Sequence, residues 1–420
     1  MIKIALKDIS IIINSGLTPL RSNQEFWLNG NIPWVKTEQL GEKYIYDSNE
    51  KITKYALENT SIKLNPANTL SIAMYGEGKT RGSVSILRNE TTTNQACCNI
   101  VIDKDKAEFE FVYYYLKTQY DNLRNLSSGV RKNLNSNDIK NFEVLLPNIQ
   151  TQKQIAKVLS DLDAKIEVNN NINQELEAMA KTLYDYWFVQ FDFPDPSSSS
   201  GQVGKPYKSS GGKMVFNEAL KREIPEGWEV NDLLSIANIT TGRLDSNSEV
   251  VDGDYYFYTC AANPTKTDSY AFDDSVILIA GNNAAGNFHV NRFTGKFNAY
   301  QRTYIITTKK KLHLDYLYQV ISRQMKVLKT RGNGSQTKFL TIGMLNDIQI
   351  FEPNSNLMNE FAEKTIPMYK KQVNLMRENQ KLSELRDWLL PMLMNGQVTV
   401  GEVEQELGMV AEDNVKYGEV

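Results

Sequence analysis

A long internal repeat divides this chain of 420 residues into two related halves. Matching residues stand 206 positions apart (353 − 147): Pro147-Asn148 with Pro353-Asn354, Asn173-Gln174-Glu175-Leu176 with Asn379-Gln380-Lys381-Leu382, Gln95 with Gln301, Lys132 with Lys338, and Leu134 with Leu340. We expect this register to hold along both halves without a net gap. A repeat of this length indicates two copies of one folding unit, each about half of the chain.

Each half shows the same order of elements. A region rich in Thr, Tyr, Ile, Val and turn residues comes first, at about residues 1–145 and 223–350, and a long helix follows it. The pattern predicts an α+β chain. It would have two mixed α/β domains with β-rich cores, related by pseudo-two-fold internal duplication.

The first helix is expected between about residues 150 and 188. Apolar and amide residues recur there at alternating spacings of four and three, which is the heptad pattern of a coiled coil. At 1.5 Å per residue this helix would be about 58 Å long. Its seam includes Ile155, Leu159, Leu162, Ile166, Leu176 and Leu183.

The second helix has a weaker seam, which includes Leu375, Leu382 and Leu389. Pro367 is expected to bend or interrupt it, because proline lacks the N–H of a helical hydrogen bond. A long amphipathic helix cannot bury its seam on one small sheet domain, so we expect the two helices to pair antiparallel and to separate the domains. The alternative is two ordinary helices, each packed on its own domain.

These elements define six expected segments. They are a first domain (1–145), a first long helix (146–190), a flexible connector rich in Ser, Gly and Pro (191–222), a second domain (223–350), a second long helix (351–397) and an acidic tail (398–420). We expect the connector to be flexible and the tail to be frayed.

Composition limits the partners and the compartment. The formal net charge of −3 argues against a general nucleic-acid binder, although a groove reader needs only a local basic face. No apolar run approaches the roughly 20 residues that cross a bilayer. Cys97, Cys98 and Cys260 form no metal-spaced set. We therefore expect a cytoplasmic protein without a metal site.

Several stretches carry a resemblance to a known family. They are "LLPNIQTQKQIAKVLSDLDAKIEVNNNINQELEAMAKTLYDYWFVQFDFP" (145–194), "ENQKLSELRDWLLPMLMNGQV" (378–398), "GLTPLRSNQEFWLNGNIPWVKT" (16–37), "TNQACCNI" (93–100) and "IPEGWEV" (224–230). With these stretches the chain resembles the specificity subunits of type I restriction-modification systems. The resemblance covers nearly the whole chain before the acidic tail.

The resemblance implies two target recognition domains, each reading one part of a split double-stranded DNA target, and helices that dock two methyltransferase subunits. It also implies that motor-nuclease subunits can join the assembly. S-adenosylmethionine is then expected on the methyltransferase subunits, whereas this chain would bind no cofactor and catalyse no reaction. Because the halves differ in sequence, the target should be bipartite and asymmetric, with an unread spacer.

Residues 73–80, "AMYGEGKT", fit the loose pattern of a phosphate-binding loop. Such a loop must open a helix, but the following "RGSVSIL" and the preceding "TLSIAM" both favour strands. The stretch therefore predicts strand, turn and strand. Lys79, Thr80 and Arg81 would lie on a DNA-contacting loop and not at a nucleotide.

Other DNA-contact candidates combine flexible glycines with side chains that reach phosphates and base edges. Two equivalent loops do so, "SSGVRKNLN" (127–135) and "RGNGSQTKFL" (331–340). The alternative for each residue is a solvated turn without DNA contact. The candidates are Asn94, Gln95, Arg131, Lys132 and Asn133 in the first half, and Arg243, Gln301, Arg302, Arg331, Asn333, Ser335, Gln336 and Lys338 in the second.

Fragments of catalytic motifs also occur. Asp161-Leu162-Asp163-Ala164-Lys165 ends like a nuclease metal site, but it lies on the heptad helix, where both carboxylates are expected as solvated charges on the outer flank. No Asn-Pro or Asp-Pro pair completes the loop of a DNA-amino methyltransferase. The competing hypotheses are a coiled-coil scaffold whose sheet domains bind protein, and a stand-alone DNA-modifying enzyme.

Overall fold

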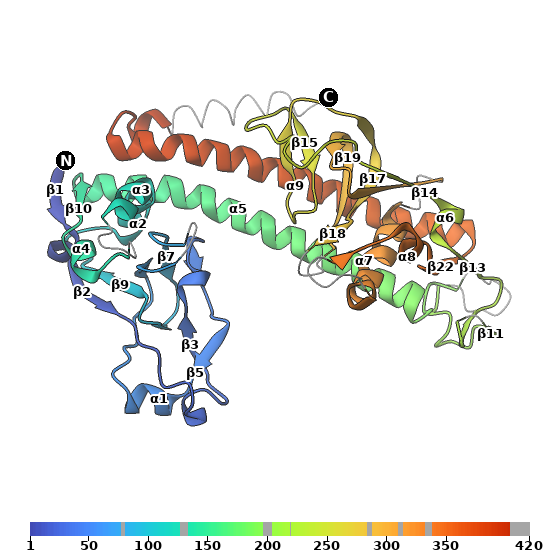
Figure 1. Cartoon of the computed structure of the whole chain (residues 1–420), viewed down its shortest axis with the longest axis horizontal. Helices are drawn as coiled ribbons and strands as arrows, with labels where there is room; N and C mark the ends of the chain where they lie inside the picture. The colour runs from blue at the N-terminus through green and yellow to red at the C-terminus, as the bar shows by residue number, and fades with distance from the viewer. Residues whose placement is uncertain are drawn as a thin grey trace. The chain divides into compact units, whose positions relative to one another are not determined.

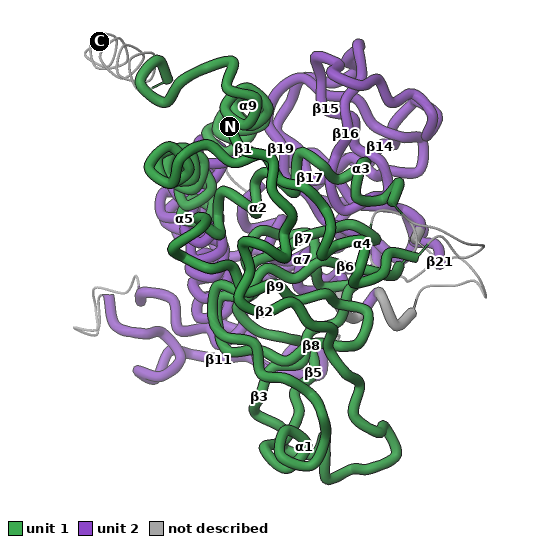
Figure 2. Tube along the Cα trace, turned by 90° about the vertical axis from the view of Figure 1, so that its left-hand side faces the viewer, with its two compact units in different colours: residues 1–169, 377–420 green, residues 170–376 purple. Residues whose placement is uncertain are grey.

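The computed structural model describes residues 1–76, 80–126, 133–195, 204–218, 220–283, 288–309, 314–331 and 338–403, except for the side chains of residues 283, 326, 327 and 329–331. The chain forms two compact units, which Figure 2 colours separately. Unit 1 comprises residues 1–169 and 377–420, and unit 2 comprises residues 170–376. Each unit contains a β-rich region and part of both long helices, so the fold is mixed α/β as expected.

Unit 1 is built on a five-stranded sheet. Helix α2 (Phe109–Thr118) covers this sheet and buries three aromatic rings in the core of unit 1. A smaller sheet carries helix α1 (Lys54–Asn59). The large sheet has the order β2 (Ser10–Ser15), β9 (Cys97–Ile102), β6 (Thr69–Ala73), β7 (Val84–Leu87) and β4 (Tyr44–Ile45), and the small one has β5 (Glu50–Ile52), β3 (Ile32–Val35) and β8 (Thr92–Thr93).

Unit 2 is built on a six-stranded sheet, which helix α7 (Leu314–Arg331) covers. The apolar run of strand β17 (Phe272–Ala280) supplies the middle of this sheet, and Ile277 and Ile279 are fully buried. The strand order is β14 (Ala237–Thr241), β20 (Thr303–Thr308), β17 (Phe272–Ala280), β19 (Val290–Ala299), β15 (Tyr255–Tyr258) and β16 (Thr265–Thr267).

Two long helices dominate the chain, α5 (Ile149–Tyr184) and α9 (Ser355–Asn395) (Figure 1). Within unit 1, Asn169 Nδ2 donates to Asn379 Oδ1 at 2.8 Å. Further along, Arg386 Nη1 donates to Asp163 Oδ1 at 2.8 Å. Residue numbers fall along α9 as they rise along α5, so the helices are antiparallel in this unit, as expected.

Some of the seam residues pack both on the other long helix and on a sheet domain. Ile155, Leu159 and Leu162 join the core of unit 1, where they meet both α9 and the side chains of α2. The helices therefore pair with each other and also pack on a sheet domain, so each of the two hypotheses for the helices holds in part. Leu375 and Leu389 are also buried, whereas Ile166, Leu176, Leu183 and Leu382 are half-buried.

Pro367 lies within the continuous helix α9, so the expected interruption at this residue is wrong. Proline removes the hydrogen bond to the carbonyl four residues earlier, that of Glu363. Both Pro367 and Glu363 are exposed, so solvent can take the place of the missing donor.

The constant register of the repeat holds only from the middle of each half onward. Cys97 N donates to Asn94 O, and Thr303 N, 206 residues later (303 − 97), donates to Tyr300 O. Nearer the start of each half the spacing is larger. Leu17 N donates to Thr93 O, whereas its counterpart Arg243 N, 226 residues later (243 − 17), donates to Ala299 O. The segment from Leu17 to Thr93 is therefore twenty residues longer (226 − 206) than the segment from Arg243 to Ala299. The longer segment includes α1.

The connector and the tail are more ordered than expected. Phe193 is buried and its ring stacks on Tyr207 and Trp228, with centroids 4.6 and 5.2 Å away. At the other end of the chain, Val400 and Val403 are buried in the core of unit 1. Residues 196–203 and 404–420 lie outside the described part of the chain.

Asp163 is not a solvated charge, which corrects the expectation for the Asp161–Lys165 fragment. Asp161 is exposed, but the side chain of Asp163 is only 13% exposed. It accepts hydrogen bonds from Arg386 and from Tyr114 of α2, and Lys43 Nζ lies 3.4 Å from its Oδ2. The helix has a second buried flank, because α2 and the sheet cover the side that a two-helix seam leaves open.

Burial alone would raise the pKa of Asp163, but its hydrogen bonds from Tyr114 and Arg386 and the charges of Lys43 and Arg386 hold that pKa below its usual range. At Lys43 the effect of burial is the largest, so the pKa of Lys43 is lowered although the charges of Glu110 and Asp163 act to raise it. Lys43 is therefore the charge in this cluster that depends most on its carboxylate partners.

Candidate nucleic-acid interface

The first candidate loop joins β6 to β7. The two strands pair antiparallel, with Thr69 opposite Leu87 and Ile72 opposite Val84, so the prediction of strand, turn and strand is confirmed. No helix follows the glycines, which removes the geometry of a phosphate-binding loop. Thr80 and Arg81 are half-buried at the end of this turn, and Lys79 lies outside the described residues.

Gly16 lies close to the backbone of a second turn, which contains Thr93 and Asn94. A Cβ atom on Gly16 would lie 2.2 Å from Thr93 O and 2.3 Å from Asn94 O, so only glycine fits there. Gln95 is exposed at this turn, and its amide oxygen accepts a hydrogen bond from Thr18. Asn94 Oδ1 accepts from Ala96 N at 3.1 Å, which holds the turn in shape.

The second domain repeats this construction. A Cβ atom on Gly242 would lie 2.1 Å from Ala299 O and 2.4 Å from Tyr300 O. Gln301 follows and is exposed, and its Nε2 donates to Asp245 Oδ1 at 3.0 Å. A glutamine amide is thus presented on an equivalent turn in each unit. Amides of this kind can pair with adenine in the major groove.

Arg302 lies close to the short strand that carries Lys338 in unit 2. Strand β18 (Asn282–Asn283) pairs with β21 (Lys338–Phe339), and Gly281 N donates to Arg302 O at 2.8 Å. Arg302 is exposed and its guanidinium lies 5.6 Å from the ring of Phe339. The structure therefore brings the Arg302 guanidinium close to β21, the strand that carries Lys338, although the two residues are far apart in the sequence.

The first domain has a matching connection, because Leu134 N donates to Met74 O at 3.1 Å, as Leu340 N donates to Gly281 O. Asn133 is half-buried beside it. Arg243 is exposed, with its guanidinium 5.8 Å from the ring of Phe272. Arg331 is the last residue of α7, and its side chain is not described. The remaining candidates lie outside the described residues: Arg131, Lys132, Asn333, Ser335 and Gln336.

Arg21 is not among the residues expected from the sequence. Its guanidinium lies 3.9 Å from the centroid of the Trp27 ring and 4.6 Å from that of Trp34, and it pairs with Glu50. Trp34 is buried in the core of the first domain. Two tryptophans seven residues apart after an arginine could have indicated this stacking.

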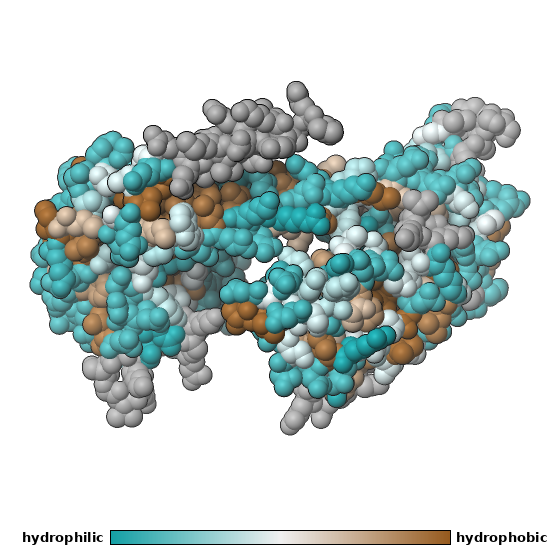
Figure 3. Space-filling model, turned by 90° about the horizontal axis from the view of Figure 1, so that it is seen from above, coloured by the Kyte–Doolittle hydropathy of each residue, from teal (hydrophilic) through white to brown (hydrophobic). Residues whose placement is uncertain are grey.

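One face of the chain is mostly hydrophilic. Figure 3 shows one face, on which hydrophilic residues predominate and apolar residues form separate patches. Among the described residues, no group of His, Cys, Asp and Glu could hold a metal ion. No helix in that part of the chain is both long and apolar enough to cross a membrane.

Comparison with known proteins gives a consistent assignment. The family model for the type I restriction modification DNA specificity domain matches residues 2–178 and 225–362. The type I restriction enzyme MjaIX specificity subunit of Methanocaldococcus jannaschii is 27% identical to this chain over 95% of it and 93% of the relative. The EcoDI specificity subunit of Escherichia coli is 33% identical, over 42% of this chain and 40% of the relative.

The fold has a solved counterpart as well. The crystal structure of the S subunit of a type I restriction-modification system from M. genitalium superimposes with a TM-score of 0.59 at 18% identity, over 93% of this chain and 95% of the other. The two matched segments of the family model fall in the two halves of the repeat, in agreement with an internal duplication.

Proposed function

This chain belongs to the type I restriction-modification DNA specificity family, and on that premise we propose that it reads a bipartite, asymmetric DNA target, one part with each of its two β-rich domains. The observation that supports this most directly is the repeated turn. In each unit a glycine that cannot carry a side chain approaches a turn that exposes a glutamine, Gln95 in one and Gln301 in the other. Equivalent turns with different neighbours would read different bases.

In this proposal, partner subunits catalyse the reactions. Two methyltransferase subunits would dock on the chain and bind S-adenosylmethionine, and motor-nuclease subunits would join through them in the cytoplasm. The relatives are named as specificity subunits, and this chain would likewise be a non-catalytic subunit. Co-expression with a methyltransferase subunit tests this division of labour: methyl transfer should need the partner, and methylation by this chain alone would favour a stand-alone enzyme.

The second candidate function is a scaffold whose sheet domains bind protein. Its support is the formal net charge of −3, which a DNA-binding protein must overcome locally. Gel shift with random duplexes separates the two functions. A DNA reader should bind with an affinity that falls steeply with salt, because bound phosphates release counterions, whereas a scaffold should not bind.

Domain exchange tests independent reading. Replacing residues 1–145 with the corresponding domain of another specificity subunit should change one half of the target and leave the other half as it was. Methylation-sensitive sequencing of a host that carries the full operon measures both halves. If both halves change together, the two domains do not read independently.

Helix length tests whether α5 and α9 set the unread spacer. Each is one uninterrupted helix that contributes to both units. One added heptad in each helix, after Asn169 and after Met376, would lengthen it by about 10 Å, or roughly three base pairs of DNA. The spacer should grow accordingly. The same seven residues inserted after Ser200 in the connector should leave the spacer unchanged, and an unchanged spacer in both variants would rule out the helices as the ruler.

A further inference from the structure

Equivalent helix positions in the two units carry different residues. The 206-residue spacing relates Asp163 to Tyr369 (369 − 163) and Ala180 to Arg386 (386 − 180). In unit 1 the Arg386 guanidinium is largely buried and donates to Asp163. In unit 2 the corresponding position is a methyl group, so α5 supplies no guanidinium there.

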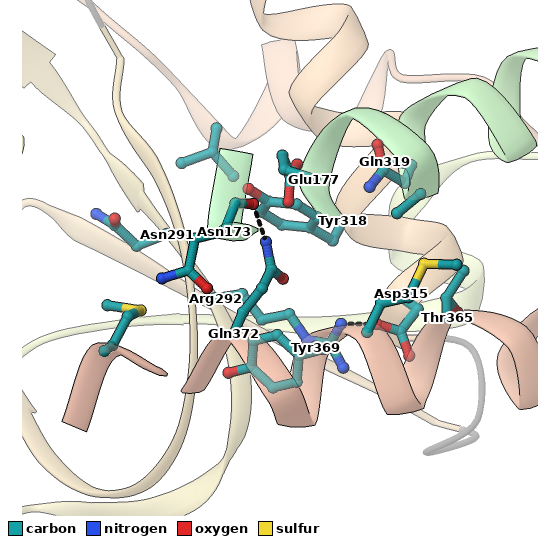
Figure 4. A pocket seen from close by; sticks show the side chains of 14 residues that line it. Asn173, Glu177, Asn291, Arg292, Asp315, Tyr318, Gln319, Thr365, Tyr369 and Gln372 are labelled. Atoms are coloured by element: carbon teal, nitrogen blue, oxygen red, sulfur yellow. Dashed lines mark hydrogen bonds and ion pairs between the residues drawn. The ribbon is translucent and has the colours of Figure 1, made fainter. Parts of the chain in front are cut away.

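A cavity of about 200 Å³ lies beside Ala180 (Figure 4). Its walls come from α5, α7, α9 and β19, all within unit 2. Asn173 and Glu177 precede Ala180 by about two turns and one turn, so the three residues share one face of α5. Tyr369 and Gln372 of α9 form the facing wall, and Gln372 Nε2 donates to the Asn173 carbonyl oxygen at 3.0 Å.

The cavity contains an acceptor without a donor. Oδ1 of Asn173 is buried and has no hydrogen-bond partner among the described residues. A buried polar atom in that state is costly, and in native proteins it usually has a water or ligand partner. In unit 1 the equivalent Asn379 Oδ1 does receive a hydrogen bond, from Asn169. Leu375 stands where Asn169 would be needed in unit 2, and it cannot donate.

The described side chains that line the cavity include two carboxylates and one cation. The cation is Arg292, whose guanidinium stacks on Tyr369 at 3.6 Å and pairs with Asp315. Glu177 remains as a second carboxylate in the wall. Burial raises the pKa of Tyr318 to about 12, and the charge of Glu177 adds to the rise, so this tyrosine stays neutral and adds no third negative charge.

We propose that this cavity binds a guanidinium-type cation in the space that the small side chain of Ala180 leaves open. Asn173 Oδ1 and the Glu177 carboxylate would accept its hydrogen bonds, and the cavity has room for the cation and a short aliphatic stem. This site is separate from the DNA-reading turns and does not depend on the proposed function. The cation could come from a free small molecule or from an arginine of a partner protein, and both offer the same group.

A second unpartnered atom distinguishes these sources. Nε of Arg292 is a buried donor without an acceptor among the described residues. The main-chain carbonyl of an arginine in a peptide can accept from it, whereas a simple guanidinium such as agmatine offers no acceptor. Tighter binding of N-acetylarginine amide than of agmatine would indicate a protein partner, and equal binding would indicate a free cation.

Isothermal titration calorimetry on the full chain tests the proposal. We expect both compounds to bind at millimolar concentration, and Glu177→Gln to weaken binding about ten-fold or more, since it removes a charge-assisted hydrogen bond. Glu175→Gln, an equal charge change at an exposed position of the same helix, is the matched control and should bind as the unaltered chain does. Ala180→Arg should fill the cavity, abolish binding and raise the midpoint of thermal unfolding.

Two results would overturn the proposal. One is the absence of binding by either compound to the unaltered chain. The other is equal binding by the Glu177→Gln and Glu175→Gln variants. If Ala180→Arg fails to fold, the comparison of these two glutamine variants still decides.

Discussion

Asp163→Ala is expected to lower the free energy of unfolding of this chain by about 3–5 kcal/mol, since it removes the most buried carboxylate partner of two buried cations. Arg386 and Lys43 both lose their contact with Asp163, and their side chains are only 18% and 10% exposed. Lys43 has Glu110 as its remaining partner, at 3.5 Å, and burial already lowers its pKa. The penalty is the desolvation of two charges and not the loss of one surface ion pair.

Asp161→Ala is the matched control. It is the same substitution two residues earlier on α5, where the carboxylate is 64% exposed and pairs with Lys157 at 2.5 Å. Exposed pairs of this kind contribute at most about 1 kcal/mol. Urea unfolding followed by circular dichroism measures both variants. Equal losses would show that the Asp163 cluster is not a buried network.

The two variants should also differ in acid. The pKa of Asp163 is held below its usual range in the folded chain, so its contribution to stability is complete above the unfolded value, about 3.9, and is lost as pH falls through the folded value. Asp163→Ala should remove that part of the acid sensitivity, whereas Asp161→Ala should retain it. The measurement is the unfolding free energy at several pH values below neutrality.

Local sequence patterns predicted some elements correctly and failed for others for physical reasons. Alternating residues in 69–87 identified β6 and β7, because a two-residue period depends only on neighbours along the strand. The heptad seam likewise identified Leu159 as buried. Asp163 was misplaced, because a helical period defines the face toward one partner and does not include α2, which covers the adjacent flank with Tyr114.

The same limit applies to the candidate site. Gln95 and Gln301 were found because they keep the 206-residue spacing. Gly16 and Gly242 were not recognised as equivalents, because the extra residues of the first half shift their spacing to 226 (242 − 16). Their requirement for glycine comes from backbone oxygens about eighty and sixty residues away along the chain (93 − 16 and 299 − 242), a contact that exists only after folding.

Gly242→Ala should abolish reading of one half of the target, and Gly16→Ala should abolish reading of the other. The added Cβ on Gly242 would lie 2.1 Å from Ala299 O, so the backbone of that turn must move by about 1 Å to restore an ordinary contact. Overpacking of this kind costs about 1–3 kcal/mol, which corresponds to roughly a ten- to hundred-fold loss of affinity if the turn contacts DNA.

Gly343→Ala in α8 (Ile342–Asn346) is the control for these variants, since its nearest new contact would be an ordinary 3.9 Å from Thr341 Oγ1 and alanine favours a helix. Duplexes in which one or the other half of the target is scrambled show which half each variant still reads. Because the two glycines belong to different units, each variant should bind as well to a duplex scrambled in its own half as to the intact target. A Gly242→Ala variant that remained sensitive to both halves would show that this turn does not carry the side chains that contact the bases. The DNA-reading surface of unit 2 would then lie elsewhere.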